Sequence, residues 1–347
     1  MRQILIIVFL ILYSNVFSQS SKCNRNDFNR ANPRFFLAEV HDLRINGQYD
    51  SILSLLDTRT KEDTVIEPFY YHQYACFYAL KKNYTESFKN LYKALHFGIF
   101  INDVLTDTDI ELLYNHSEWS IIKDTISAIY LRNNPHITDT SLSLNLWQMG
   151  IEDQRYRTLG RNNKRCNLIK GSLEYDSISE IHNNKIKANR FFIKELIRKK
   201  KWPLYSQVGQ EAGDAAFLIV QHSGDNRLTK RALKLIEIAV KNDEASKSSY
   251  AMMLDRYLMH KGRKQIYGTQ AITYSKGVDD NGKPIMGKTF LWPIDDEFNV
   301  NKRRKEMGMS SIEENAKRLG VEYKYISNYE TMKCKPLVKL LKENSLK

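Results

Sequence analysis

The chain lacks the short motifs that mark common enzyme chemistry. Its 347 residues contain no G-x-S-x-G, H-E-x-x-H or G-x-G-x-x-G pattern. These patterns hold a nucleophile, a zinc ion and a dinucleotide, respectively. The sequence therefore signals no standard reaction, and it leaves open whether the protein is an enzyme.

Cysteine is scarce, and its placement excludes the usual redox and zinc motifs. The 4 cysteines are Cys23, Cys76, Cys166 and Cys334. None stands in a C-x-x-C pair or in a Cys/His cluster with zinc-ligand spacing, so we expect no redox motif, no metal site and no cofactor. Cys76 lies within the apolar run 74–78 and is expected to be a buried thiol.

Long apolar runs are also scarce, and the run that bears on the protein's location lies within the first eighteen residues. Arg2 precedes an uncharged apolar stretch over residues 4–13, and Val16 and Ser18 are small or tolerated residues at positions −3 and −1 of a cleavage site. The stretch is shorter than the ~20 residues that cross a bilayer and is typical of a secretory signal peptide. We expect cleavage after Ser18, no transmembrane anchor afterwards, and a secreted or periplasmic protein whose four cysteines allow three disulfide pairings.

Acidic residues are outnumbered, with 40 Asp+Glu against 53 Lys+Arg and a formal net charge of +13. The basic runs 198–201 and 302–305 would suit an anionic partner. In an exported protein, however, we expect solvated faces or contacts with anionic envelope material, and no nucleic acid as partner. The hydrophobic content of 42% is that of a globular protein, and the length suits two domains.

Residues 32–132 contain an internal repeat at an offset of 35 residues. Five apolar columns recur, broken only by Ser87: Val40/Ala75/Ile110, Leu43/Tyr78/Leu113, Tyr49/Tyr84/Trp119, Ile52/Ser87/Ile122 and Leu56/Leu91/Ile126. Their spacing fits two helices joined by a tight turn, with Gly47 at the first turn. This period resembles that of tetratricopeptide repeats. The resemblance implies a concave surface that binds a protein or peptide; the open alternative is that the helices only support the second domain.

The rest of the chain is predicted to be a helical domain with one β-hairpin. Pro135 separates it from the repeats. Helices are expected over 142–157, 185–200, 207–222, 228–241, 247–260 and 299–307, and extended segments over 265–274 and 288–294. Residues 160–184 are expected to be loop or a loosely packed helix. The fold class is thus mainly α: a signal peptide (1–18), a polar leader (19–31), a tetratricopeptide-like array (32–132), a helical domain with a small β-hairpin (135–325) and a tail (326–347).

An ordered series of motifs in this second region resembles the family known as domain of unknown function 6624. The main segments are 214–222, 250–256 and 265–270, supported by Trp202-Pro203, 293–296 and Arg303-Arg304. The resemblance implies no activity, because the family has none assigned. It does indicate which polar residues to examine.

Asp255 and Arg256 lie in an otherwise apolar helix, so each must find a partner elsewhere. We therefore predict one polar centre, with His222, Asp255 and Arg256 as candidate catalytic residues and Arg157 and Asp153 as partners for Asp255 and Arg256. Its candidate ligand-binding residues are Asp153, Gln154, Arg157, Gln221, Tyr267 and Gln270. The centre is either a structural network or a site that binds an anion or supports hydrolysis. Two functions stay open: a protein- or peptide-binding module of the cell envelope, or a hydrolase or small-ligand-binding enzyme.

Overall fold

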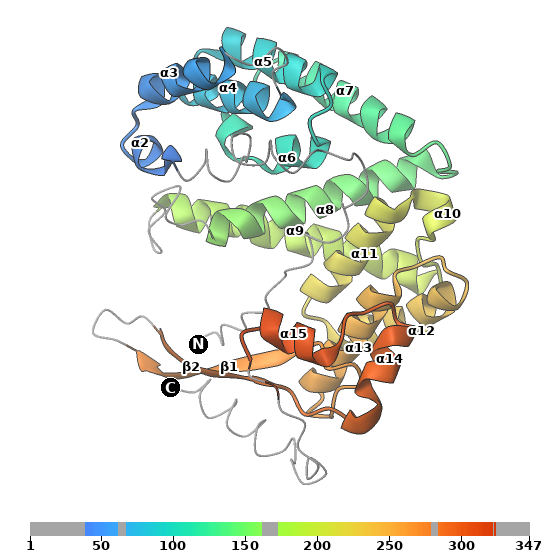
Figure 1. The fold of residues 1–347 in the computed structure, drawn as a ribbon. Helices are drawn as coiled ribbons and strands as arrows, with labels where there is room; N and C mark the ends of the chain where they lie inside the picture. Colours follow the sequence, from blue (N-terminus) through green and yellow to red (C-terminus); the bar gives the residue numbers. More distant parts are fainter. Residues whose placement is uncertain (1–38, 62–66, 162–172, 279–283, 322, 324–347) are drawn as a thin grey trace. The chain divides into compact units, whose positions relative to one another are not determined.

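The structure is a computed structural model that describes residues 39–61, 67–161, 173–278, 284–321 and 323. The fold is mainly α-helical with one two-stranded antiparallel sheet, which confirms the predicted class (Figure 1). The expected signal peptide, leader and tail lie outside the described residues, as do Cys23, Cys166 and Cys334. No helix in the described part of the chain is long and apolar enough to cross a membrane.

The chain divides into two compact units. The described residues of the N-terminal unit fall within 39–189 and 206–215, and those of the C-terminal unit within 190–205 and 216–323. The N-terminal unit carries α2 (His41–Ile45), α3 (Tyr49–Thr60), α4 (Pro68–Leu80), α5 (Tyr84–His96), α6 (Ile101–Thr106), η1 (Asp109–Leu113), α7 (Glu118–Asn133), α8 (Thr140–Arg161), and the starts of α9 (Leu173–Arg198) and α11 (Gln210–His222).

The repeat region folds into successive helical hairpins. The first consists of α2 and α3, the second of α4 and α5, and the third of η1 and α7, preceded by α6. Helix α4 packs on α3 and α5, and α5 packs on α7. All the residues of the five repeat columns are buried or half-buried. Ser87, the exception to the apolar pattern, is buried and its hydroxyl donates to the Ala75 carbonyl at 2.6 Å. In the third hairpin, Ile110 and Leu113 lie in the 3₁₀ helix η1 rather than in an α-helix.

The turns of the first two hairpins share one backbone conformation. Gly47 has φ +68°, and Lys82, which stands 35 residues later, has φ +60°. A left-handed conformation is unstrained for glycine but costs a residue with a Cβ about 1 kcal/mol. The repeat geometry is therefore kept at Lys82 although the glycine is lost.

Helix α8 continues the N-terminal unit past Pro135. The Tyr130 ring of α7 stacks on Trp147 of α8 at 4.3 Å between centroids. The Tyr130 hydroxyl lies 3.0 Å from Ser143 Oγ, and Ser143 donates to the Val208 carbonyl. The compact units therefore divide within α9 and α11, while the sequence places a join near Pro135.

Helix α9 begins earlier than the helix predicted over 185–200. It starts at Leu173, within the stretch 160–184 that was expected to be loop or a loosely packed helix. Residue Phe191, expected on the apolar side, is 69% exposed, while Ile193 and Ile197 are buried. The buried positions are four residues apart, as one helix face requires, and Phe191 lies off that face.

The C-terminal unit packs helices against a small hairpin. It contains the ends of α9 and α11, α12 (Asn226–Lys241), α13 (Lys247–His260), β1 (Ala271–Val278), β2 (Pro284–Leu291), η2 (Glu297–Asn299), α14 (Val300–Glu306) and α15 (Ile312–Arg318). Ser246 caps α13 by accepting from the Ser249 amide. Helix α15 was not predicted, although its Ser311–Glu314 capping box is visible in the sequence.

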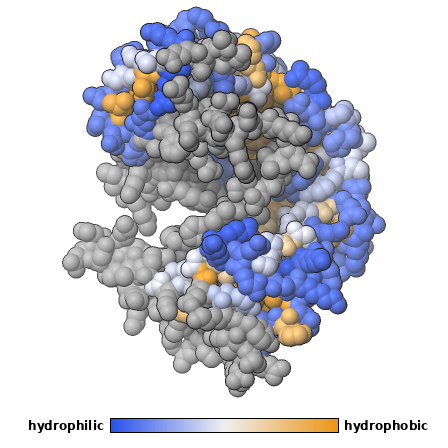
Figure 2. Space-filling model, viewed as in Figure 1, coloured by the Kyte–Doolittle hydropathy of each residue, from blue (hydrophilic) through white to orange (hydrophobic). Residues whose placement is uncertain are grey.

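The β-hairpin starts later than expected. Strands β1 and β2 pair from Ala271↔Leu291 to Val278↔Pro284. Residues 265–270, expected to begin the first strand, form a loop instead. This loop is the centre of the C-terminal unit's polar contacts. On the face drawn in Figure 2 the described surface is mostly hydrophilic, with hydrophobic residues in small separate patches.

Candidate functional site

Asp255 holds the loop that follows its own helix. The carboxylate is completely buried and accepts from the backbone amides of Ile266 at 2.7 Å, Tyr267 at 3.1 Å and Thr269 at 3.0 Å. The Thr269 hydroxyl donates to it as well, at 3.0 Å. Burial raises the pKa of Asp255 above its usual value, and the hydrogen bonds from Thr269, Ile266 and Tyr267 offset only part of this rise. Every partner is a donor, an arrangement that favours the carboxylate form.

Gln265 closes the same loop from its other end. Its side-chain amide donates to the carbonyls of Gln270 at 3.0 Å and Trp292 at 2.5 Å, and its oxygen accepts from the Gln270 amide at 2.8 Å. Asn315 of α15 donates to the Gly268 carbonyl at 2.9 Å. We call the loop 265–270 with the side chains that bind it the loop clamp.

Two arginines of α14 complete the loop clamp. Arg304 donates to the carbonyls of Tyr267 and Ser310, each at 2.6 Å, and Arg303 donates to the Ile266 carbonyl at 3.0 Å. Burial and the nearby Arg318 lower the pKa of Arg304 to about 10. The expectation that residues 302–305 form a solvated face is therefore wrong for Arg304, which is completely buried.

Gly268 allows the loop to lie against α15. Its φ is +69°, and a Cβ at this position would stand 2.4 Å from Cδ1 of Ile312 and 3.0 Å from Cδ1 of Ile294. Both the backbone conformation and the close packing require glycine. The glycine in the motif at 265–270 is thus explained by the backbone conformation of the loop and by its packing against Ile312 and Ile294.

The other predicted residues lie in several places. Tyr267 and Gln270 belong to the loop clamp, and the Gln270 side chain donates to Thr269 Oγ1 at 2.9 Å. Asp153 and Gln154, on α8 of the N-terminal unit, contact each other at 3.0 Å. His222 is half-buried at the C-terminus of α11. The Arg157 side chain lies outside the described residues.

Gln221 and Arg256 line a shallow depression in the C-terminal unit. Its other lining residues are Gly224, Asn226, Thr229, Met253, Tyr257 and His260. The space takes about one or two waters, which is small for a substrate. Of the predicted residues, the structure therefore brings Gln221 and Arg256 to one depression. It brings Asp255, Tyr267 and Gln270 to the loop clamp.

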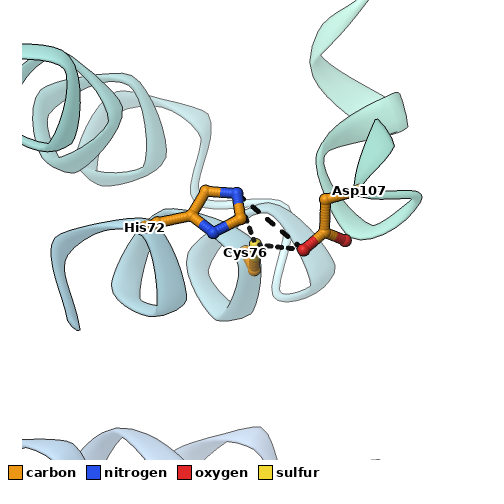
Figure 3. Close-up of side chains that lie close together, drawn as sticks. All are labelled: His72, Cys76 and Asp107. Atoms are coloured by element: carbon orange, nitrogen blue, oxygen red, sulfur yellow. Dashed lines mark hydrogen bonds and ion pairs between the residues drawn. The ribbon is translucent and has the colours of Figure 1, made fainter. Parts of the chain in front are cut away.

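A second polar cluster lies in the N-terminal unit, between the second and third hairpins (Figure 3). Its members are His72 and Cys76, one helical turn apart on α4, and Asp107, which follows α6. Cys76 Sγ lies 3.7 Å from His72 Nε2 and 3.5 Å from Asp107 Oδ2, and these last two atoms are 3.8 Å apart. His72 and Cys76 are buried, and the Asp107 side chain is 27% exposed.

This cluster does not have the geometry of a cysteine nucleophile. Burial raises the pKa of the Cys76 thiol, and the charges of Asp107 and Asp109 raise it further. A reactive cysteine needs a lowered pKa. In a Cys/His pair the third group holds the histidine nitrogen that faces away from the sulfur, whereas here Asp107 approaches Nε2, the nitrogen nearest Cys76. The three side chains nevertheless present three atoms of the kind that ligate metals, within 4.8 Å of one another.

The comparisons with known proteins give one match. Residues 180–326 match the family described as Family of unknown function (DUF6624). No curated protein and no solved structure matches the chain. The DUF6624 match begins within α9 and ends beyond α15, so the tetratricopeptide resemblance of the hairpins stays a prediction.

The residues that match DUF6624 include the whole loop clamp, so the motifs at 250–256 and 265–270 can be explained by their contacts in the structure. The segments 250–256 and 265–270 meet where Asp255 holds the loop amides. Sequence reasoning missed Gln265, Asn315 and the role of Arg304 as partners of this loop. It also missed the His72, Cys76 and Asp107 cluster, for which the i,i+4 spacing of the first two on a helix was the available signal.

Proposed function

We propose that the protein is exported and binds a protein or peptide of the cell envelope through its N-terminal helical hairpins. The observation that carries the proposal is an aromatic cluster at the surface of the second hairpin, made of the half-buried Tyr71 and the exposed His96 and Phe97, with Lys93 beside them. Tyr71 and Phe97 stack at 5.4 Å between centroids, and Phe97 is 52% exposed. Lys93 Nζ lies 5.3 Å from the centre of the Tyr71 ring.

Such a surface has the composition of an interface hot spot. Exposed aromatic side chains offer a large apolar area, and they lose little entropy when a partner covers them. The adjacent Lys93 and the exposed His96 add donors, so an apolar segment with acidic neighbours complements the cluster. Stacked hairpins also hold these side chains on rigid helices, which lowers the cost of binding.

A hydrolase centred on His222, Asp255 and Arg256 is the weaker candidate. The Asp255 carboxylate already accepts from four donors of the loop clamp. A buried carboxylate used in this way is not available as a general base. The depression beside Arg256 is also small. A ligand site there remains a prediction.

The binding proposal is tested with a displayed random-peptide library selected on the full-length chain. Selected peptides are then titrated against the wild type and against a Tyr71→Ser/Phe97→Ser variant. We expect the double substitution to weaken binding at least 30-fold, as loss of a hot spot of about 2 kcal/mol implies. The matched control is Phe298→Ser in the C-terminal unit, where Phe298 is 80% exposed. Equal loss in the control, or none in the double variant, refutes the proposed surface.

Export is tested separately by fusing residues 1–30 to a reporter that is active only after translocation. We expect activity, and we expect N-terminal sequencing of the exported full-length protein to begin at Gln19. An inactive fusion, or an intact Met1 on the exported protein, contradicts the proposed export route.

A further inference from the structure

We propose that His72, Cys76 and Asp107 bind one divalent zinc ion. The inference is independent of the proposed peptide binding, since it rests on a different set of side chains. It concerns the junction between α4 of the second hairpin and the segment after α6 in the third.

The distances carry the proposal. Zinc binds cysteine sulfur at about 2.3 Å and histidine nitrogen or carboxylate oxygen at about 2.0–2.2 Å, so tetrahedral coordination puts the ligand atoms about 3.4–3.6 Å apart. The three separations here are 3.7, 3.5 and 3.8 Å. A triangle of these sides has a point about 2.1 Å from each corner, which is a metal–ligand bond length.

The same distances are poor for hydrogen bonds. The His72–Asp107 separation of 3.8 Å exceeds the range of an N–H···O bond, and the two contacts of Cys76 involve a thiol, which is a weak donor and a weak acceptor. Three polar atoms that surround one point, and that are linked only through weak hydrogen bonds of a thiol, fit an ion shared among them.

The ligand types select the metal. A mixed sulfur, nitrogen and oxygen set suits zinc, whereas calcium and magnesium prefer oxygen alone. Helical spacing supplies two ligands, because His72 and Cys76 share a face of α4. Three protein ligands leave a fourth position for water or another ligand, and the partial exposure of Asp107 gives solvent a route to it.

A further contact orients the third ligand. Asp107 Oδ1 accepts from the backbone amide of Asp109 at 2.9 Å, which leaves Oδ2 directed at His72 and Cys76. Asp109 is in turn paired with Arg44 of α2. Hydrogen bonds of this kind fix metal ligands in place. A bound ion would join the second and third hairpins at their contact.

The test uses untagged, full-length protein that is first stripped of metal under a non-chelating reductant. Zinc is titrated by calorimetry, and cobalt is used as a spectroscopic probe. We expect one zinc per chain, a cobalt complex with a thiolate charge-transfer band, and binding at least tenfold weaker in Cys76→Ser and in Asp107→Asn. Asp107 is the most exposed ligand, so its variant tests the site even where a core substitution prevents folding.

Two controls separate this site from other metal-binding groups. His41→Gln removes an exposed histidine of α2 in the same unit, and Cys23→Ser/Cys166→Ser/Cys334→Ser removes the other thiols. Both variants should bind zinc as the wild type does. The proposal is overturned if stoichiometric binding is absent, if Asp107→Asn binds normally, or if the triple variant loses the site.

Discussion

Replacing Asp255 by asparagine tests whether the loop clamp holds the C-terminal unit together. Asparagine has the size of aspartate but only one accepting oxygen, and its amide group would face the N–H groups of Tyr267 and Thr269. The four donors now bound to Asp255 would then compete for one oxygen, leaving about two of them buried without a partner. Each costs about 1–3 kcal/mol, so we expect a loss of about 3 kcal/mol.

Hydrogen exchange at the backbone amides of the loop measures this loss of stability directly. A change of 1.4 kcal/mol is tenfold, so the amides of residues 266–269 should exchange about a hundredfold faster in Asp255→Asn than in the wild type. The control is Asp243→Asn, an exposed aspartate of the same unit, where we expect a change within about 0.5 kcal/mol. Protection of 266–269 that stays within threefold of wild type would refute the clamp.

Three further predictions concern other parts of the fold. Gly268→Ala should destabilise the C-terminal unit by about 2 kcal/mol more than Gly308→Ala does, as measured by urea unfolding. Both glycines have positive φ, but of the two only Gly268 has neighbours within 4 Å of an added Cβ. Equal losses of stability would contradict the packing argument. Lys82→Gly should stabilise the hairpins by up to about 1 kcal/mol, measured as a rise in the thermal midpoint, since Lys82 holds φ +60° in an exposed turn; a fall would show that this turn is unstrained. Zinc affinity should rise by up to tenfold for each pH unit. Burial raises the pKa of the Cys76 thiol, and a zinc ion that binds there must displace the thiol proton. Equal affinities by calorimetry at pH 6.5 and 7.5 would exclude thiolate coordination.

Local patterns in the sequence predicted much of the fold. The five repeat columns located the buried faces of the hairpins, and the helix predicted over 247–260 coincides with α13. These signals depend on neighbours one or two turns away, which the sequence displays directly. The predicted β-hairpin exists but begins at Ala271, because the aromatic and β-branched residues before it form a loop fixed by distant side chains.

The site was harder to predict, because its partners are distant in sequence. Asp255 was recognised as a buried charge in need of a partner, but an arginine was expected and backbone amides were found. Backbone donors carry no residue-type signal. Asp107 stands 31 residues from Cys76, and only the stacking of successive hairpins brings them together. Arg304 resembles a surface cation in the sequence, and its burial follows from the packing of α14 on the loop.

The central claim is that the protein binds its partner on the hairpins, while the polar motif of the C-terminal unit serves the fold. One titration tests it directly: a selected peptide against the wild type, Tyr71→Ser/Phe97→Ser, and Arg256→Gln. Our account predicts at least a 30-fold loss for the hairpin variant and affinity within twofold of wild type for Arg256→Gln. Full affinity in the hairpin variant together with lost affinity in Arg256→Gln would contradict it.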